Sequence, residues 1–255
     1  MSGTVSSLKP LPGNPATRPS LTEGLTATVA AKTSAVQQVL QDAAGEFADS
    51  GGVAFANSFG AEDMVLTDII FRHRLLVAVF SLDTGRLPVE TYALMGEVER
   101  HYGQKLEVYF PESPAVEQYV RSQGINAFYD SVELRKECCR IRKVEPLRRA
   151  LAGRGAWVTG LRAAQSPTRS GLPVREFDAG NGLTKYNPLS DWSEEEVWAY
   201  IRLHAVPYNA LHDQFYPSIG CAPCTRAIAV GEDIRAGRWW WEDPASKECG
   251  LHVKK

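Results

Sequence analysis

Short apolar runs that alternate with helix-like segments are the feature that most restricts the fold of this 255-residue chain. Four runs are expected to form buried strands, at 53–56, 75–80, 106–109 and 157–159. Apolar residues at helical spacing separate them, and Gly51-Gly52 ends the first helical segment. This alternation predicts an α/β fold with a doubly wound, mostly parallel sheet.

The expected helices cover 25–47, 64–70, 89–98, 132–151 and 194–203. Pro146 should kink or split the helix over 132–151, because proline has no N–H to donate. Ser193 is a good N-cap for the last helix. Apart from that helix, the chain beyond Gly171 shows little regular patterning.

Three loops follow the predicted strands, where ligands bind in open α/β sheets. The segment 58–63 joins a strand to a helix through a glycine, an arrangement that can bind an anion, although Asp63 could equally be an ordinary N-cap. The loop 82–85 follows the second strand. Arg162 and Arg169 follow the fourth, and arginine suits phosphate or sulfate. The alternative for that loop is a solvent-exposed segment with incidental charge.

Four of the five cysteines form two pairs far apart in the chain, which indicates a metal centre: Cys138, Cys139, Cys221 and Cys224. A structural zinc site is the main rival, and a redox dithiol or buried free cysteines are simpler readings. Adjacent helical residues point about 100° apart. A cubane iron–sulfur cluster, which takes one thiolate at each iron, accommodates such a pair better than one small ion does.

Basic residues surround the first cysteine pair, with seven Lys or Arg and two acidic residues from 135 to 149. Lys143 comes four residues after Cys139 and should share its helical face, where it would join an anionic cluster to an anionic substrate. A solvated basic face is the alternative. Arg235 and Arg238 are further candidates, whereas the three tryptophans at 239–241 are expected to pack.

The composition limits the class of protein. A net charge of −2 gives no indication of nucleic-acid binding, and no apolar run is long enough to span a membrane. An odd number of cysteines and no signal-like N-terminus favour a reducing, cytoplasmic location. We expect a disordered arm at 1–24, one nucleotide- and cluster-binding domain at 25–241, and a mobile tail at 242–255.

Together these motifs resemble the assimilatory adenosine 5′-phosphosulfate (APS) reductases, iron–sulfur members of the PAPS/APS reductase family. The resemblance covers nearly everything after the N-terminal arm. The matching motifs are 58–63, 82–85, Cys138-Cys139, 159–169, Cys221-x-x-Cys224, 235–242 and 248–252. Related reductases of the 3′-phosphorylated substrate (PAPS) generally lack the four cluster cysteines. One departure is Phe59, where many relatives carry a serine.

The resemblance implies an adenine nucleotide alpha hydrolase-like, Rossmann-like fold and reduction of APS to sulfite and AMP during sulfate assimilation and cysteine biosynthesis. It implies an S-sulfocysteine intermediate on Cys249, thioredoxin or glutaredoxin as reductant, one [4Fe-4S] cluster on the four paired cysteines, and a homo-oligomer. The positions that match substrate-binding residues are Ser58, Gly60, Leu82, Asp83, Gly85, Lys143, Gly160, Arg162, Arg169, Arg235, Arg238 and His252.

Three other functions stay open. The protein could use PAPS, alone or together with APS. A zinc-stabilised nucleotide- or nucleic-acid-binding protein would explain the four thiols but leaves Cys249 without a role. An ATP pyrophosphatase would share the loops at the strand ends but is expected to have a fuller Ser-Gly-Gly loop than 58–60.

Overall fold

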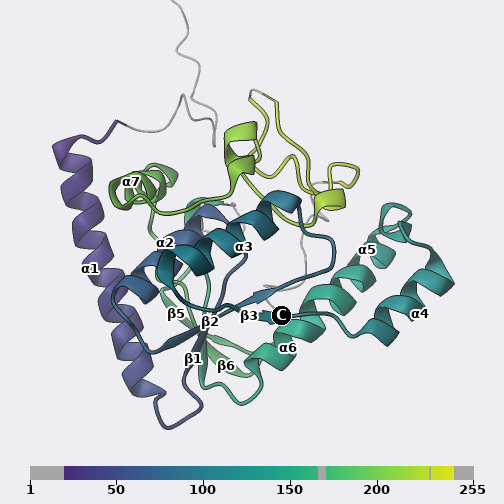
Figure 1. Ribbon diagram of the computed structural model, residues 1–255, viewed down its shortest axis with the longest axis horizontal. Helices are drawn as coiled ribbons and strands as arrows, with labels where there is room; N and C mark the ends of the chain where they lie inside the picture. Colours follow the sequence, from purple (N-terminus) through teal and green to yellow (C-terminus); the bar gives the residue numbers. More distant parts are fainter. Residues whose placement is uncertain (1–19, 166–170, 230, 244–255) are drawn as a thin grey trace, which may run out of the picture.

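A single six-stranded sheet organises the molecule, with strand order β3-β2-β1-β4-β6-β5 (Figure 1). The computed structural model describes residues 20–165, 171–229 and 231–243. Neighbouring strands are parallel except for β5 and β6, so the predicted doubly wound, mostly parallel fold is confirmed. The strands are β1 Val53–Ala56, β2 Val77–Leu82, β3 Glu107–Tyr109, β4 Ala156–Val158, β5 Arg175–Asp178 and β6 Leu183–Tyr186.

Seven α-helices and several short turns connect the strands within the described residues. The α-helices are α1 Glu23–Glu46, α2 Ala61–Arg72, α3 Val89–Tyr102, α4 Ser113–Gln123, α5 Val132–Cys139, α6 Glu145–Leu151 and α7 Glu194–His204. The shorter segments are η2 Ala127–Tyr129, η3 Arg140–Val144, η4 Ala163–Gln165, η6 Ala210–Gln214 and η7 Ala222–Cys224.

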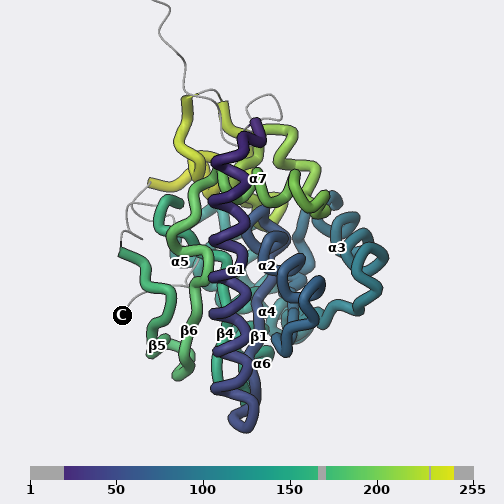
Figure 2. The backbone as a smooth tube through the Cα atoms, turned by 90° about the vertical axis from the view of Figure 1, so that its left-hand side faces the viewer, coloured from purple at the N-terminus to yellow at the C-terminus, as the bar shows by residue number. Residues whose placement is uncertain are grey.

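Alternating residues of β1 face two separate cores. Val53 and Phe55 belong to the larger core, together with buried residues of α1, α2, α3 and α7. Ala54 faces the other side and packs with Trp157 of β4 and Leu147 of α6. Helices therefore cover both faces of the sheet, and Figure 2 shows α1 running lengthwise over one of them. Buried on both sides, the central strands have the continuous apolar sequences typical of parallel sheets.

The chain reverses its direction across the sheet between β1 and β4. Val53 of β1 pairs with Val77 of β2 on one side and with Ala156 of β4 on the other. The chain builds β2 and β3 outward in one direction and then returns to add β4 and β6 in the other. A crevice at the carboxyl ends of β1 and β4 follows from this reversal, and it is the usual place for a ligand in such folds.

The helix predicted over 132–151 is a continuous run of three segments, in which α5 and α6 are separated by the π-helical turn η3. In that turn the N–H of Glu145 donates to the carbonyl of Arg140, five residues earlier. Pro146 lies in the first turn of α6. Pro146 has no N–H to donate, so a regular α-helix would lose one backbone hydrogen bond there. The wider turn lets the helix continue past this position.

Helices α4 and α5 form a lobe beside the sheet, visible at the right of Figure 1. Its core is small and is built around Tyr119, Ala127 and Ile141. The sequence did not predict α4, nor the antiparallel pair β5 and β6. It did predict α7, where Ser193 and Glu196 form a reciprocal capping box.

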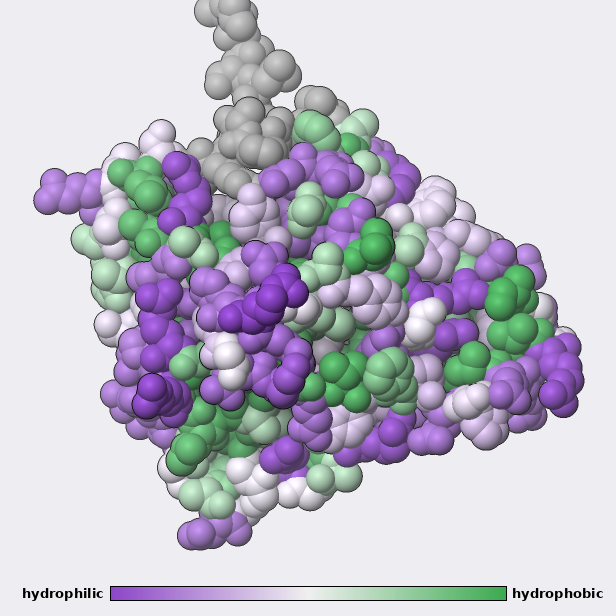
Figure 3. Space-filling model, in the orientation of Figure 1, coloured by the Kyte–Doolittle hydropathy of each residue, from purple (hydrophilic) through white to green (hydrophobic). Residues whose placement is uncertain are grey.

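The termini bear on the domain boundaries expected from the sequence. Helix α1 begins at Glu23, just inside the predicted arm 1–24, and Thr22 caps it. Residues 1–19 of that arm and 244–255 of the predicted tail lie outside the described residues. Hydrophilic and hydrophobic residues are interspersed on the face in Figure 3. None of the helices in the described ranges is long and apolar enough to cross a membrane.

Candidate active site and cysteine-lined cavity

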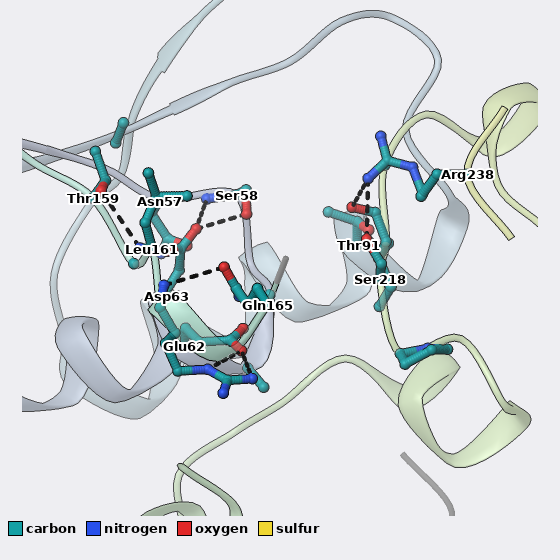
Figure 4. Close-up of a pocket in the computed structure, with 18 of the residues that line it drawn as sticks. Asn57, Ser58, Glu62, Asp63, Thr91, Thr159, Leu161, Gln165, Ser218 and Arg238 are labelled. Carbon is teal, nitrogen blue, oxygen red and sulfur yellow. Dashed lines mark hydrogen bonds and ion pairs between the residues drawn. The ribbon is translucent and has the colours of Figure 1, made fainter. Parts of the chain in front are cut away.

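A cavity of about 280 Å³ opens at the carboxyl ends of the strands. Residues of the loops after β1 and β4 lie on one side, and Ser218 and Arg238 lie on the other (Figure 4). The loop after β2 and the segments 217–220 and 234–239 also line the cavity. Eight of the predicted substrate-binding residues line it: Ser58, Gly60, Leu82, Lys143, Gly160, Arg162, Arg235 and Arg238. The structure therefore brings together positions spread over most of the chain. Arg169, His252 and Cys249 lie outside the described residues.

The loop after β1 holds a carboxylate of its own. The Ser58 N–H and Oγ donate to Asp63 Oδ2 at 2.7 Å and 2.6 Å. A Cβ atom at Gly160 would lie 2.1 Å from Asp63 Oδ1, so only glycine lets the β4 loop approach this closely. Burial raises the pKa of Asp63 to about 6 despite the donors from Ser58. The N-cap of α2 is Gly60, so the interpretation of Asp63 as an ordinary N-cap is wrong.

Phe59 sets the shape of the same loop. Its backbone is in the left-handed region at φ 62°, and its side chain is only 1% exposed. The Phe59 N–H donates to Asn57 Oδ1 at 2.7 Å, which supports this conformation. A bulky residue rarely adopts a positive φ. Here burial of the Phe59 ring and the hydrogen bond to Asn57 stabilise a backbone conformation that glycine usually adopts.

Arg162 lines the cavity but points its guanidinium toward a carboxylate. Its Nε and Nη2 lie 2.8 Å and 2.7 Å from Glu62 Oε1. Burial favours the neutral acid, but Arg162 outweighs it and holds the pKa of Glu62 below its usual range. The Arg162 side chain is 5% exposed, and its Nη1 also donates to the Trp192 carbonyl at 3.3 Å. The sequence did not reveal this pair, because the partners are 100 residues apart.

Three basic side chains also line the cavity, namely Lys143 of η3 and Arg235 and Arg238 of the segment after η7. Figure 4 shows Arg238 on the side away from Glu62 and Asp63. The Arg238 Nη1 donates to Ser218 Oγ and to the Ile219 carbonyl, both at 3.3 Å (Figure 4). Cationic side chains from distant parts of the chain thus converge where an anionic group of a ligand could bind.

The loop after β2 contributes Leu82 to the cavity lining, whereas Asp83 and Gly85 do not line it. Asp83 Oδ1 accepts hydrogen bonds from the Gly85 N–H at 2.7 Å and from the Tyr92 hydroxyl at 2.8 Å. Burial and then Asp83 raise the pKa of Tyr92 to about 12. Asp83 and Gly85 therefore shape this loop from behind the cavity wall.

All four paired cysteines line a second, smaller cavity next to the first. Cys138 and Cys139 end α5, whereas Cys221 precedes the turn η7 and Cys224 is its last residue. The other residues that line this cavity are Arg86, Phe128, Arg135, Arg142, Lys143 and Pro223. Lys143, which lies in the π turn η3, lines both cavities.

Polar side chains reach the cysteines from the neighbouring loop. Thr84 Oγ1 lies 3.3 Å from Cys221 Sγ, and Arg142 donates to the Thr84 carbonyl at 2.6 Å. Arg142 and Arg135 are almost fully buried, which the sequence did not predict. Their spacing carried a usable signal, since Arg135, Cys139 and Arg142 recur at i, i+4 and i+7 on one helical stripe.

The four thiols line one cavity, so the fold brings both cysteine pairs to a single place. A cubane cluster takes one thiolate at each of its four irons, and this donor set supplies four thiolates.

Comparison with known proteins places the chain in a family. The family model described as the phosphoadenosine phosphosulfate reductase domain matches residues 52–227 of the sequence. The chain belongs to the phosphoadenosine phosphosulfate reductase family. The resemblance stated from the motifs is thereby confirmed, and the match spans β1 to the residues just after the second cysteine pair.

Relatives of the family are similar over most of their length. The chain is 66% identical to a protein of Allochromatium vinosum over 203 residues, 80% of this chain and 79% of that protein. It is 53% identical to a protein of Neisseria meningitidis serogroup A over 235 residues, 92% of this chain and 95% of that protein. Both relatives are named adenosine 5′-phosphosulfate reductase.

Solved structures agree on the fold. A phosphoadenylyl-sulfate (PAPS) reductase from Candida auris, in a phosphate complex, aligns with a TM-score of 0.64 and 30% identity, covering 82% of this chain and all of that one. An FMN adenylyltransferase from Candida glabrata aligns with a TM-score of 0.54 at 14% identity, covering 91% of this chain and 81% of that one. The second likeness concerns the fold alone.

Proposed function

We propose that this member of the family reduces APS to sulfite and AMP in the assimilation of sulfate. The position of Lys143 carries the proposal, because this one cation lines both the cavity at the strand ends and the cavity of the four cysteines. A substrate with an anionic end could lie against Lys143 while its nucleoside occupies the remaining cavity. The names of the similar bacterial proteins support APS as that substrate.

The polarity of the cavity suggests how APS is bound. Adenosine would lie between Leu82 and the Gly160 loop, next to Ser58 and Gly60. The phosphosulfate would extend toward the cations at the opposite end, namely Lys143, Arg235 and Arg238, joined by Arg169 and His252. Arg162 would hold the Glu62 carboxylate in place at the cavity wall. Asp83 and Gly85 would hold the loop that carries Leu82.

The chemistry uses a thiol for a two-electron reduction. The Cys249 thiolate would attack the sulfur of APS, and the bond from that sulfur to the bridging oxygen would break, releasing AMP and leaving an S-sulfocysteine. A thiolate of thioredoxin or glutaredoxin would then attack the Cys249 sulfur and expel sulfite. Its second thiol would resolve the mixed disulfide, so that oxidation of this dithiol supplies the two electrons. The cationic side chains would offset the negative charge that otherwise repels the incoming thiolate.

We also propose one [4Fe-4S] cluster on Cys138, Cys139, Cys221 and Cys224. All four cysteines line one cavity, which supports a shared metal centre, and the adjacent pair Cys138-Cys139 favours a cluster over one small ion. When bound, the cluster would supply a fixed array of charge beside the basic end of the substrate cavity. We place the reaction in the cytoplasm and expect a homo-oligomer.

The intermediate on Cys249 gives the direct test of the reaction. With APS and no reductant, wild-type protein should gain the mass of one sulfonate, and Cys249→Ser should bind APS without that gain. Addition of thioredoxin should release sulfite only from the wild type. Sulfite production that survives the substitution would show that the reductant attacks APS itself. Replacing APS by PAPS tests the alternative substrate, for which we expect a much lower kcat/KM.

Iron analysis tests the cluster. Anaerobically purified protein should be brown and contain about four irons per chain. Cys138→Ser or Cys224→Ser should lose colour and activity together, whereas Cys249→Ser should keep the colour. A colourless zinc protein with full activity would exclude the cluster.

A further inference from the structure

Gly220, just before the second cysteine pair, lies directly against the guanidinium of Arg238. A Cβ atom at position 220 would lie 2.3 Å from Arg238 Nη2, 2.6 Å from Cζ and 3.1 Å from Nη1. The first two separations are far below the sum of van der Waals radii, and the third is slightly below it. Any side chain at position 220 would therefore displace the head of Arg238.

Space, and not backbone conformation, accounts for a glycine here. Gly220 is absent from the described glycines with a positive φ, so other residues could adopt its backbone angles. Its N–H donates to Thr225 Oγ1 at 3.1 Å, a bond that any residue except proline could make. The close contact with Arg238 is the remaining reason for the missing side chain.

The other contacts of Arg238 fix its head in the same position. Its Cζ lies 4.7 Å from the centre of the Trp239 ring, and its Nη1 donates to Ser218 Oγ and to the Ile219 carbonyl at 3.3 Å. Arg238 is 8% exposed, although it lines the large cavity. A flat, rigid guanidinium is thus held by an aromatic ring, two oxygen acceptors and the bare backbone of Gly220.

We propose that Gly220 is a positioning residue that seats the guanidinium of Arg238 for the sulfate end of the substrate. This inference rests on the proposed function, since it takes the anion to be the phosphosulfate of APS. Gly220→Ala would move the guanidinium without a clash against backbone, because the atoms in the way belong to the end of a flexible side chain. The variant should therefore fold and bind the nucleoside but hold the phosphosulfate poorly.

The test compares Gly220→Ala with wild type and with Gly45→Ala, a control glycine in α1 that has no atom within 4 Å of an added Cβ. We expect kcat/KM for APS to fall about 10- to 100-fold in Gly220→Ala, because small misplacements of positioning groups have effects of this size. Inhibition by adenosine, which has no anionic group, should change less than about twofold, and the iron content should be unchanged. Gly45→Ala should match the wild type in all three measurements.

A double-mutant cycle identifies Arg238 as the group through which Gly220 acts. Arg238→Lys alone should also lower kcat/KM, since an ammonium cannot make the planar contacts. In that background Gly220→Ala should cost less than about twofold, because no guanidinium remains to be displaced. Fully additive losses would overturn the proposal, as would a crystal structure of Gly220→Ala with the Arg238 head unmoved.

The controls separate this inference from the proposed function. If wild-type protein does not reduce APS, the proposed function fails, and the crystal structure of the variant alone decides the seating of Arg238. If wild type is active and Gly220→Ala keeps its kcat/KM within twofold, only the role of Gly220 fails. If Gly220→Ala loses iron, the variant Ser218→Ala is used in its place. Ser218→Ala removes one of the oxygen atoms that accept a hydrogen bond from Arg238. That variant should lower kcat/KM for APS about three- to tenfold, and an unchanged value would overturn the proposal.

Discussion

Two adjacent carboxylates at the start of α2 differ because their partners differ. Asp63 is buried and Glu62 is half-buried, and burial favours the protonated form of each. The guanidinium of Arg162 overcomes that effect at Glu62, whereas the neutral donors of Ser58 do not overcome it at Asp63. Asp63 therefore changes its protonation near pH 6 while Glu62 stays ionised.

The raised pKa of Asp63 predicts a pH dependence of stability. It is about 6 in the folded protein against 3.8 ordinarily, so the folded state holds more protons between these values and deprotonation destabilises it. Stability from this group is fully present below about pH 4 and is lost as the pH rises through 6. A difference of about two units corresponds to about 3 kcal/mol, part of which falls between pH 5 and 7.5.

Thermal unfolding of Asp63→Asn against wild type measures this effect. The midpoint of the wild type should fall between pH 5 and 7.5 by several degrees more than that of the variant. Asp42→Asn, at an exposed position on α1, is the control and should keep the wild-type slope. Parallel slopes for wild type and Asp63→Asn would contradict the assignment.

At the scale of elements, a buried ion pair joins α5 to the segment after Trp239. Arg135 donates through Nε and Nη2 to the two oxygens of Glu242 at 2.8 Å and 2.7 Å. Their side chains are 0% and 3% exposed, and the Arg135 guanidinium also lies 4.7 Å from the centre of the Trp239 ring. The helix that carries the first cysteine pair is thereby fixed to the last described segment of the chain.

Breaking this pair should destabilise the protein strongly. Glu242→Gln should lower the free energy of unfolding by about 3–5 kcal/mol, because it leaves a buried guanidinium without its counter-charge. Glu137→Gln is a matched control, since Arg140 contacts Glu137 with the same bidentate geometry at 2.7 Å. This pair is exposed, with 49% of the Arg140 side chain and 43% of the Glu137 side chain accessible. That change should cost less than about 1 kcal/mol. Equal losses in the two variants, measured by urea unfolding, would contradict this account.

Elements with strong local signals could be predicted from the sequence, and those that depend on distant partners could not. Strand β1 and helix α7 were predicted because apolar runs and a serine cap are local features. Strands β5 and β6 have four residues each, with several polar or charged side chains. They exist because β6 pairs with β4 and β5 pairs with β6, contacts that no local pattern encodes.

The candidate site also has features that could be predicted from the sequence and features that could not. The loops after β1, β2 and β4 were predicted to meet, and they do, because parallel strands place their carboxyl ends together. The direction of each side chain was not predictable. Arg162 faces Glu62 and Asp83 faces Tyr92, and both orientations follow from tertiary contacts.

At the scale of the whole molecule, the cysteines lie where the α4–α5 lobe meets the body. The lobe has a small core of its own, and direct contacts include the hydrogen bond from the Tyr129 hydroxyl to the Pro223 carbonyl at 2.7 Å. Arg86 adds a bond to the Ile125 carbonyl at 2.5 Å. A cluster bound by both cysteine pairs would join the two parts covalently, so its stability and that of the lobe should be coupled.

Removal of the metal tests this coupling. After chelation of iron, backbone amides of α4 and α5 should exchange with deuterium at least about tenfold faster, since fewer contacts then oppose local opening. Amides of β1 and α2, in the main core, should keep their protection. Cys224→Ser should reproduce the pattern. Unchanged exchange in the lobe would mean that its own packing is sufficient.

The π turn between α5 and α6 makes chain length, and not only residue identity, a determinant of the site. One extra residue is accommodated there, and each residue of a helix advances the direction of its side chains by about 100°. The cysteines before the turn and the core residues of α6 after it are therefore set in different phases of one continuous helix. Deleting Ile141 or Val144 would remove the extra residue, close the wide turn and place Pro146 in the interior of a regular helix, where its ring clashes with a carbonyl. The link between the first cysteine pair and α6 would then change even though every cysteine and every basic residue is retained.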